Sequence, residues 1–349
     1  MSLSRGRGTR RRPQQRDHAV YAFDDSGQVR WRDVCSRFEG VYSLDTNWDG
    51  SVVVAGGWAS CEPWAGFVGA WTADGVRLLS WDRAPSRINA VCVSADGRTL
   101  AAVGDALHLF RRRANEPFPA QPSSTLELGP GFAECVRMSD DGRWITTLDG
   151  DGGLLLFEHE DGELAMRHYR WRPPEPGRAL VVEISRDGSW IVYGGADGTV
   201  HLFNRLTLIA MQRPIWSYPL VEGLAPVAVA LSPDGEHVAV AVDSGDAGKI
   251  YYLANRNGAP HLEWSKQTRR PPTGMVIDGD STWVAVVDAD PRGNGGQCYL
   301  FEADSGLIAG AYRSPGACWT VALSGDGTRM LVGSDDGTAA SIKIIKPDD

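Results

Sequence analysis

One short pattern, an Asp-Gly turn between two apolar runs, recurs through almost the whole chain. Its copies contain the strings DGSVVVAG, SADGRTLAAV, SDDGRWITTL, SRDGSWIVYG, SPDGEHVAVAV, IDGDSTWVAVV and SGDGTRMLVG. The turn aspartates are Asp49, Asp96, Asp141, Asp187, Asp234, Asp280 and Asp326, with successive spacings of 47, 45, 46, 47, 46 and 46 residues. Such a regular period indicates one structural unit repeated seven times, and it constrains the fold more than composition does.

The turn itself predicts a β-hairpin. Gly accepts a positive φ without Cβ strain, and Asp bonds to nearby backbone, so Asp-Gly between β-branched runs is a strong hairpin signal. Six copies keep the Gly, and Ser281 replaces it in the sixth. The first copy, DTNWDGS at 45–51, also looks like the start of a calcium loop. Position 12 of that loop would be Gly56 rather than the Glu that calcium requires, so we predict a hairpin and no metal site.

One repeat has the size of a propeller blade. In the fourth unit we expect strands at ALVVEIS, SWIVYGG, TVHLFNR and LIAMQRPI, within about 46 residues. The third strands share one large, mostly aromatic position, which we expect to pack between blades: Trp71, Phe110, Phe157, Phe203, Leu253 and Phe301. The predicted fold is an all-β, seven-bladed β-propeller over 18–349, with four antiparallel strands per blade.

Closure of the ring requires a strand from the other end of the chain. The chain ends 23 residues after Asp326, too soon for a complete fourth strand. We predict that QVRWRDV, at 28–34, supplies it, so that the N-terminal strand closes the ring. HAVYAFD and TAASIKII both look like the third strand of that blade, and the sequence does not choose between them.

The repeats resemble a known family. LSPDGEHVAVA and DGTVHLF are similar to the strand pairs of WD40 repeats, with Phe203 in place of the usual Trp, and VYAFDDSGQVRW resembles a repeat of the quinoprotein-type propellers. No unit opens with Gly-His or closes with a clear Trp-Asp, so the His and Asp network of strict WD40 repeats is not carried over. The resemblance implies a WD40-like propeller in the broad sense and leaves function open.

Charge separates a short tail from the body. The formal net charge is −9, yet residues 1–17 contain six arginines and one aspartate. The remaining body has 29 basic and 43 acidic residues, a balance of −14, which disfavours nucleic acid everywhere except at the tail. We expect 1–17 to be a disordered, solvated arm. No apolar run approaches the length of a membrane span, and the tail lacks the apolar core of a secretory signal.

The six cysteines form no CxxC pair. Cys92, Cys135 and Cys318 precede their turn aspartates by even offsets, so period-2 alternation places them on the same face of equivalent strands as small buried hydrophobes. We therefore expect a reducing, cytoplasmic location. A periplasmic or surface scaffold whose signal has been removed is the alternative, and a disulfide would favour it.

Catalytic motifs are not found in the sequence. There is no GxSxG, SxxK, P-loop or dinucleotide fingerprint in a suitable context. The seven histidines are scattered, and His108 and His201 occupy equivalent third-strand positions that suggest a structural role. We expect no cofactor, and the favoured function is a non-catalytic protein-interaction scaffold. The alternative is a cytoplasmic propeller hydrolase of the lactonase type, with ionisable groups at the central channel.

The loops predict which rim binds a partner. First-to-second turns are tight, and the main exception on their rim is the third-to-fourth connection at 111–124. The opposite rim has long loops at 56–66, 170–179, 213–226, 266–274 and 288–297. Trp, Tyr and Arg dominate interface energetics, and these loops provide the candidate binding residues: Trp58, Trp64, Arg170, Trp171, Arg172, Arg178, Trp216, Tyr218, Arg269, Arg270 and Arg292. The partner expected is a protein or peptide, with acidic or phosphorylated segments preferred.

Overall fold

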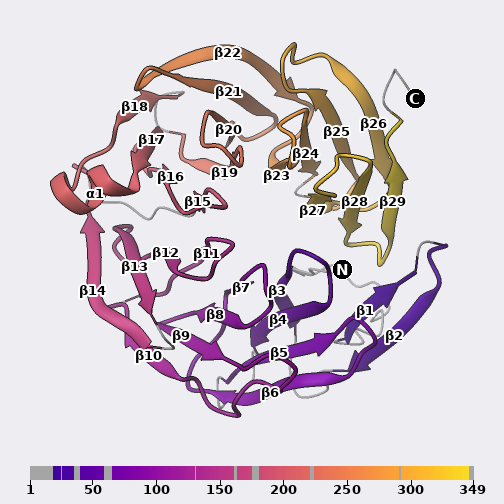
Figure 1. The fold of residues 1–349 in the computed structure, drawn as a ribbon. Coiled ribbons are helices and arrows are strands. Elements are labelled where there is room, and N and C mark those ends of the chain that lie inside the picture. Colours follow the sequence, from indigo (N-terminus) through magenta and orange to yellow (C-terminus); the bar gives the residue numbers. More distant parts are fainter. Residues whose placement is uncertain are drawn as a thin grey trace. The chain divides into compact units, whose positions relative to one another are not determined.

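The computed structural model describes residues 19–24, 26–34, 40–58, 65–129, 131–160, 163–174, 181–220, 224–290 and 292–345. The fold is the predicted one, an all-β, seven-bladed β-propeller whose complete blades have four antiparallel strands (Figure 1). The described residues form two compact units. We call them the N-terminal unit, residues up to 150 with 155–168, and the C-terminal unit, residues 151–154 and those from 169 onward.

The N-terminal unit begins with a hairpin of β1 (Ala19–Phe23) and β2 (Val29–Val34). The first blade has β3 (Gly40–Thr46), β4 (Val52–Trp58), β5 (Gly66–Thr72) and β6 (Arg77–Ala84); the second has β7 (Ala90–Val93), β8 (Thr99–Val103), β9 (Ala106–Arg111) and β10 (Ser124–Glu127). Most of the third blade also belongs here, with β11 (Val136–Met138), β12 (Trp144–Leu148), β13 (Leu154–Glu160) and β14 (Glu163–Trp171).

The C-terminal unit holds the other four blades. The fourth has β15 (Val181–Ile184), β16 (Trp190–Gly194), β17 (Thr199–Asn204) and β18 (Trp216–Pro219); the fifth has β19 (Pro226–Leu231), β20 (His237–Asp243), β21 (Gly248–Arg256) and β22 (Ala259–Thr268). The sixth has β23 (Pro272–Ile277), β24 (Trp283–Ala289), β25 (Gly296–Glu302) and β26 (Ile308–Ser314), and the seventh has β27 (Cys318–Leu323), β28 (Arg329–Ser334) and β29 (Ala339–Lys343).

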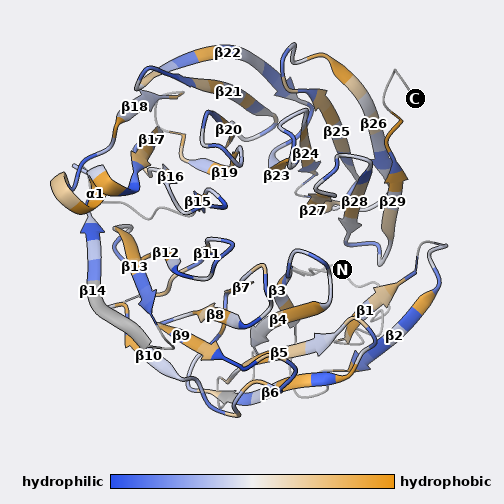
Figure 2. Ribbon diagram, viewed as in Figure 1, coloured by the Kyte–Doolittle hydropathy of each residue, from blue (hydrophilic) through white to orange (hydrophobic). Residues whose placement is uncertain are grey.

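The core lies between neighbouring sheets. First strands of consecutive blades contact each other, as β3 does β7 and β19 does β23. Second strands such as β8 and β24 are buried along their whole length, whereas fourth strands alternate, as β10 does, between half-buried and exposed residues. The outer strands accordingly mix hydrophilic and hydrophobic residues (Figure 2). The shared third-strand residues are at most 1% exposed, which confirms their expected packing role.

The repeated turn is held by a side-chain network that the sequence pattern only partly revealed. In the second blade, Ser94 Oγ donates to Asp96 Oδ1 at 2.7 Å, and Ser94 Oγ accepts from the N–H of Thr99 at 3.0 Å. Asp96 Oδ1 also accepts from the N–H of Arg98 at 2.9 Å. Ser139, Ser185, Ser232 and Ser324 repeat the Ser role. Asn47 takes that place in the first blade, where its Oδ1 accepts from the N–H of Val52, which supports the hairpin interpretation of 45–51.

Ser281 has the backbone conformation of the glycine that it replaces. The six turn glycines have φ between 66° and 73°, and Ser281 has φ 56°. An L-residue with a Cβ is disfavoured in this left-handed region. The sixth turn therefore contains backbone strain that the other six avoid.

Replacing Ser281 with Gly should raise the free energy of unfolding by about 0.5–1 kcal/mol, because relief of left-handed strain exceeds the extra entropy of an unfolded Gly. Midpoints of chemical denaturation measure the change. Ser281→Ala is the matched control, since it keeps the strained backbone and should stay within about 0.5 kcal/mol of wild type. An unchanged midpoint for Ser281→Gly would contradict the argument.

The fourth blade corrects one sequence assignment. LIAMQRPI is not its fourth strand, because α1 (Arg205–Met211) occupies the first half of that segment and β18 follows it. The helix is capped by Asn204, whose Oδ1 accepts from the N–H of Leu206 at 3.1 Å, and it buries Leu208. Its end at Gln212 is left-handed, with φ 50°. Trp216 and Tyr218 consequently lie on a strand and not on a loop.

The N-terminal hairpin is attached to the first blade. Trp31 of β2 stacks on Trp71 at 6.2 Å, and its Nε1 donates to the carbonyl of Ala73 at 2.8 Å. Asp33 accepts from Trp71 Nε1 and pairs with Arg77, each at 2.5 Å. β29 holds the third-strand place in the last blade, whereas β1 pairs with β2. Among the strand pairings of the described residues, none joins 28–34 to the last blade, and closure by that strand stays a prediction, as does the tail at 1–17, which lies outside them.

Candidate interaction surface

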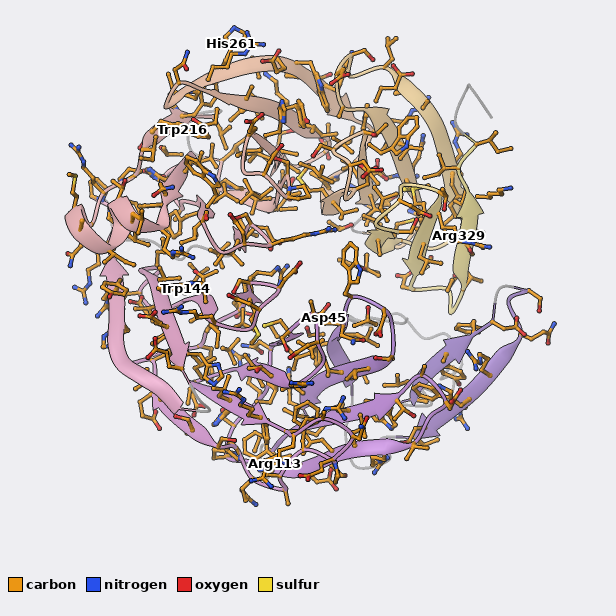
Figure 3. The ribbon with its side chains drawn as sticks, in the orientation of Figure 1. Asp45, Arg113, Trp144, Trp216, His261 and Arg329 are labelled. Carbon is orange, nitrogen blue, oxygen red and sulfur yellow. The ribbon has the colours of Figure 1, made fainter. Side chains whose placement is uncertain are left out.

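The two tryptophans at the centre of the predicted surface are packing residues. Trp171, the last residue of β14, is only 8% exposed, and its ring meets Phe203 at 5.0 Å and Tyr193 at 5.2 Å, both nearly edge-on. Trp216, which Figure 3 labels, is 5% exposed. Its Nε1 donates to Asn255 Oδ1 at 3.1 Å. Each indole therefore joins its blade to the next one and offers little area to a partner.

The other predicted aromatic residues are partly accessible. Tyr218 is half-buried on β18 and packs beside the apolar core of the fourth and fifth blades. Trp58, in the N-terminal unit, is half-buried and stacks on Tyr42, with ring centroids 5.0 Å apart and planes 8° from parallel. Trp64 and Arg178 lie outside the described residues. Of these residues, Trp58 retains the strongest case for binding.

The arginines divide between two places in the C-terminal unit. Arg170 is half-buried on β14, and Arg172 is exposed immediately after that strand. Arg269 and Arg270 follow β22, while Arg292 lies in the turn from β24 to β25.

The structure brings Arg270 and Arg292 together around one carboxylate. Asp290 accepts from the N–H of Arg292 at 2.8 Å, and this bond lowers the Asp290 pKa, with further help from the charges of Arg270 and Arg292. Arg270 also lies at the turn itself, since its Nη2 donates to the carbonyl of Asn294 at 3.2 Å. A positive site therefore forms where the fifth blade connects to the sixth.

Sequence reasoning missed a fourth member, Arg313. It is exposed on β26 opposite Gln297, at the same end of the sixth blade. Gly295 shows that this end of β26 is close to Arg270. A Cβ placed on Gly295 would lie 2.8 Å from the carbonyl oxygen of Ser314, the residue after Arg313, and 3.7 Å from Arg270 Nη1. The sequence signal is the period-2 alternation of IAGAYRS: with Tyr312 packed against the core, Arg313 takes the opposite face. We call Arg269, Arg270, Arg292 and Arg313 the arginine patch.

Buried polar groups hold the patch in position. The hydroxyl of Tyr299 accepts from the N–H of Arg269 at 3.2 Å and donates to Asp288 Oδ2 at 2.9 Å. Asp288 is fully buried, and burial raises its pKa; burial likewise raises the pKa of Tyr299 to about 12. Thr268 Oγ1 donates to the carbonyl of Arg270 at 2.6 Å. These hydrogen bonds hold the loop of Arg269 and Arg270 in place, so less conformational entropy is lost when a ligand binds.

The equivalent histidines lie within the blades, as expected. His108 Nδ1 is 3.1 Å from Thr125 Oγ1 and His201 Nδ1 is 2.7 Å from Ser217 Oγ, so each bonds to the neighbouring fourth strand. Burial lowers the pKa of both to about 4, which keeps them neutral near pH 7. Cys92, Cys135, Cys298 and Cys318 are also buried.

No group of three or more His, Cys, Asp or Glu side chains in the described part of the chain is arranged to hold a metal ion. No helix in that part has the length and apolar character needed to cross a bilayer.

Comparison with protein families identifies the repeat. Residues 178–204 and 310–340 match the WD domain, G-beta repeat; the first segment contains β15–β17, and the second contains β27 and β28 with parts of β26 and β29. The chain is a WD40-like β-propeller. A search of curated proteins gave no significant sequence match to this WD40-like propeller.

Solved structures agree on the fold of this WD40-like propeller. Sqt1 from Chaetomium thermophilum is 16% identical, with a TM-score of 0.72, 87% of this chain covered and 82% of that one. The Cps50 (Swd1) β-propeller domain from Myceliophthora thermophila is 12% identical, with a TM-score of 0.66 and coverages of 87% and 97%. The Dos1 propeller is 14% identical, with a TM-score of 0.64 and coverages of 86% and 80%. At these identities the likeness concerns the fold alone.

Proposed function

We propose that this WD40-like propeller is a non-catalytic scaffold that binds an acidic or phosphorylated segment of a protein partner at the arginine patch. The single observation that carries the proposal is that four arginines gather on one end of the sixth blade without a salt bridge to any described carboxylate. Guanidinium groups bind carboxylate and phosphate through paired N–H donors. In this proposal the protein works in a reducing compartment, the cytoplasm, where buried thiols such as Cys298 persist.

The local electrostatics support an anionic ligand. Asp290 has its carboxylate occupied by the Arg292 N–H, and Asp288 is buried with a raised pKa. Arg269, Arg292 and Arg313 are exposed, so their charges face solvent on a body that is acidic as a whole. A local excess of positive charge on an acidic protein attracts anionic segments to one place and repels them elsewhere.

Replacing Arg269, Arg270 and Arg292 together with Ala should weaken binding of acidic peptides at least about 30-fold, because loss of even one hot-spot arginine typically costs about 2 kcal/mol or more. Short Asp- and Glu-rich peptides, with and without phosphoserine, are titrated by fluorescence anisotropy. Binding by the wild type should weaken as salt rises.

A charge-matched control removes three arginines from the N-terminal unit, as Arg98→Ala, Arg111→Ala and Arg113→Ala. These side chains are exposed, and their loss changes net charge equally. Point substitutions are preferable to shortening 111–124, because Phe118 of that loop is 5% exposed and its N–H donates to the carbonyl of Leu78 at 2.9 Å. If both triple variants weaken binding equally, the effect comes from net charge alone and the proposed site is wrong. Binding that does not change with salt concentration would also overturn the proposal.

A further inference from the structure

The N-terminal unit contains two side-chain pairs built on aromatic rings, outside the arginine patch. The first is the stack of Trp58 on Tyr42. The second is Arg87 over Phe132, with the guanidinium carbon 3.7 Å from the ring centroid. Phe132 is 41% exposed although it is a large apolar residue. Large aromatic and arginine side chains that stay accessible are the residue types that anchor interfaces.

Both pairs lie on the rim of the unit where β4 ends and β5 begins. Trp58 ends β4 and pairs across to Gly66, the first residue of β5. A Cβ on Gly66 would lie 2.3 Å from the carbonyl oxygen of Ser86, the residue before Arg87. The four side chains therefore follow one rim from the first blade to the connection before the third. We call Tyr42, Trp58, Arg87 and Phe132 the aromatic strip.

The strip is built on anchored loops. Asn89 Nδ2 donates to the carbonyl of Ala133 at 2.9 Å, so the loop of Arg87 is bonded directly to the loop of Phe132. The N–H of Ala133 donates to the carbonyl of Gly104 at 2.7 Å, and Ser86 Oγ donates to Asp105 Oδ1. A side chain at Gly104 would lie 1.9 Å from the Arg87 carbonyl oxygen, so the close approach requires Gly. Such a site needs little rearrangement to accept a ligand.

The state of Arg87 indicates the chemistry of the ligand. Its Nε is buried and has no hydrogen-bond partner among the described residues, and no salt bridge to it is present there. One face of the guanidinium is covered by Phe132, so its N–H donors point sideways in the guanidinium plane. Planar, paired donors of this kind fit a carboxylate with two oxygens.

We infer that the aromatic strip binds an extended peptide in which an Asp or Glu stands close to apolar residues or Pro. The carboxylate pairs with Arg87, while the apolar side chains lie on Phe132 and on the Trp58–Tyr42 stack. The aromatic strip is a second surface, separate from the arginine patch, and the two proposals are tested independently. The patch is expected to bind peptides for their negative charge, and the strip is expected to bind peptides that have a negative charge beside apolar residues.

The test selects binders from a randomised peptide library displayed on phage, with the full-length protein as bait. Enriched peptides should carry Asp or Glu within a few residues of Leu, Phe or Pro. Synthetic copies should bind Arg87→Ala and Phe132→Ala at least about 10-fold more weakly than wild type. Arg87→Lys should lose nearly as much, because Lys keeps the charge but not the planar fork.

The matched control is Arg32→Ala, which removes another arginine of the same unit that lies over an aromatic ring, with its guanidinium carbon 5.6 Å from the centroid of Tyr21. It should bind the peptides as wild type does, and thermal midpoints check that every variant is folded. Enrichment of no peptide, or equal binding by wild type and Arg87→Ala, would overturn the inference. Peptides whose binding depends on Arg269, Arg270 and Arg292 but not on Arg87 would also overturn it, while supporting the arginine patch.

Discussion

Replacing Gly235 with Ala should destabilise the protein by about 2–4 kcal/mol, although the change adds one methyl group to a surface turn. Two costs combine at this position. The backbone has φ 72°, where an L-residue is strained, and a Cβ would lie 2.1 Å from Trp190 Cδ1 of the preceding blade. Relief would require the Trp190 ring to move, and with it part of the packing between the fourth and fifth blades.

Gly50 provides a control at the equivalent turn of another repeat. Its φ is 69°, but no atom lies within 4 Å of the position that a Cβ would take. Gly50→Ala should therefore cost only the conformational strain, about 1 kcal/mol. Denaturation midpoints of the two variants separate strain from contact between blades. Equal losses would show that the Asp-Gly turn is needed for its hairpin alone and that Trp190 adapts without cost.

The same turns show why the fold could be predicted from the sequence. A hairpin needs its Gly for a positive φ, and the preceding blade needs it for close approach, as with Gly97, whose Cβ would lie 2.7 Å from Val52 Cγ2. In the second and fifth repeats, local chemistry and packing between blades thus require the same residue at the same place. When both levels agree, a short pattern is enough to predict the architecture.

The fourth blade shows where that agreement ends. Its third strand leads into α1 and not directly into a strand, and the signals were local: Asn204 as the N-cap and a run of helix-forming residues behind it. We assigned a strand because the other repeats have one at this point. The repeat pattern outweighed the local signal, and Trp216 was consequently placed on a loop.

The binding surface was harder to predict, because residue type does not determine exposure. Arg269 and Trp171 both stand at the end of a fourth strand or just beyond it, yet one is exposed and the other is buried. Which face a side chain takes depends on strand register, and one residue of shift reverses it. Arg87 and Phe132 were missed for a related reason, since their connections are short and only tertiary contacts bring the two side chains together.

Neighbouring substitutions at the end of β14 should therefore differ strongly in their effect on stability. Trp171→Ala should cost about 3–5 kcal/mol, the usual result of deleting a buried aromatic ring. The cavity would open among Tyr193, His201 and Phe203, whose rings now lie 4.9–5.2 Å from the indole. Arg172→Ala removes an exposed side chain and should stay within about 0.5 kcal/mol of wild type.

The pair also decides how Trp171 should be used in binding experiments. If Trp171→Ala lowers the denaturation midpoint strongly, any loss of peptide binding by that variant reflects damage to the fourth blade, and only Arg172→Ala reports on contact at this place. If instead Trp171→Ala remains as stable as Arg172→Ala, the indole does not hold the blade together. In that case its three ring contacts would contribute little, and Trp171 would return to the candidate binding residues beside Trp58.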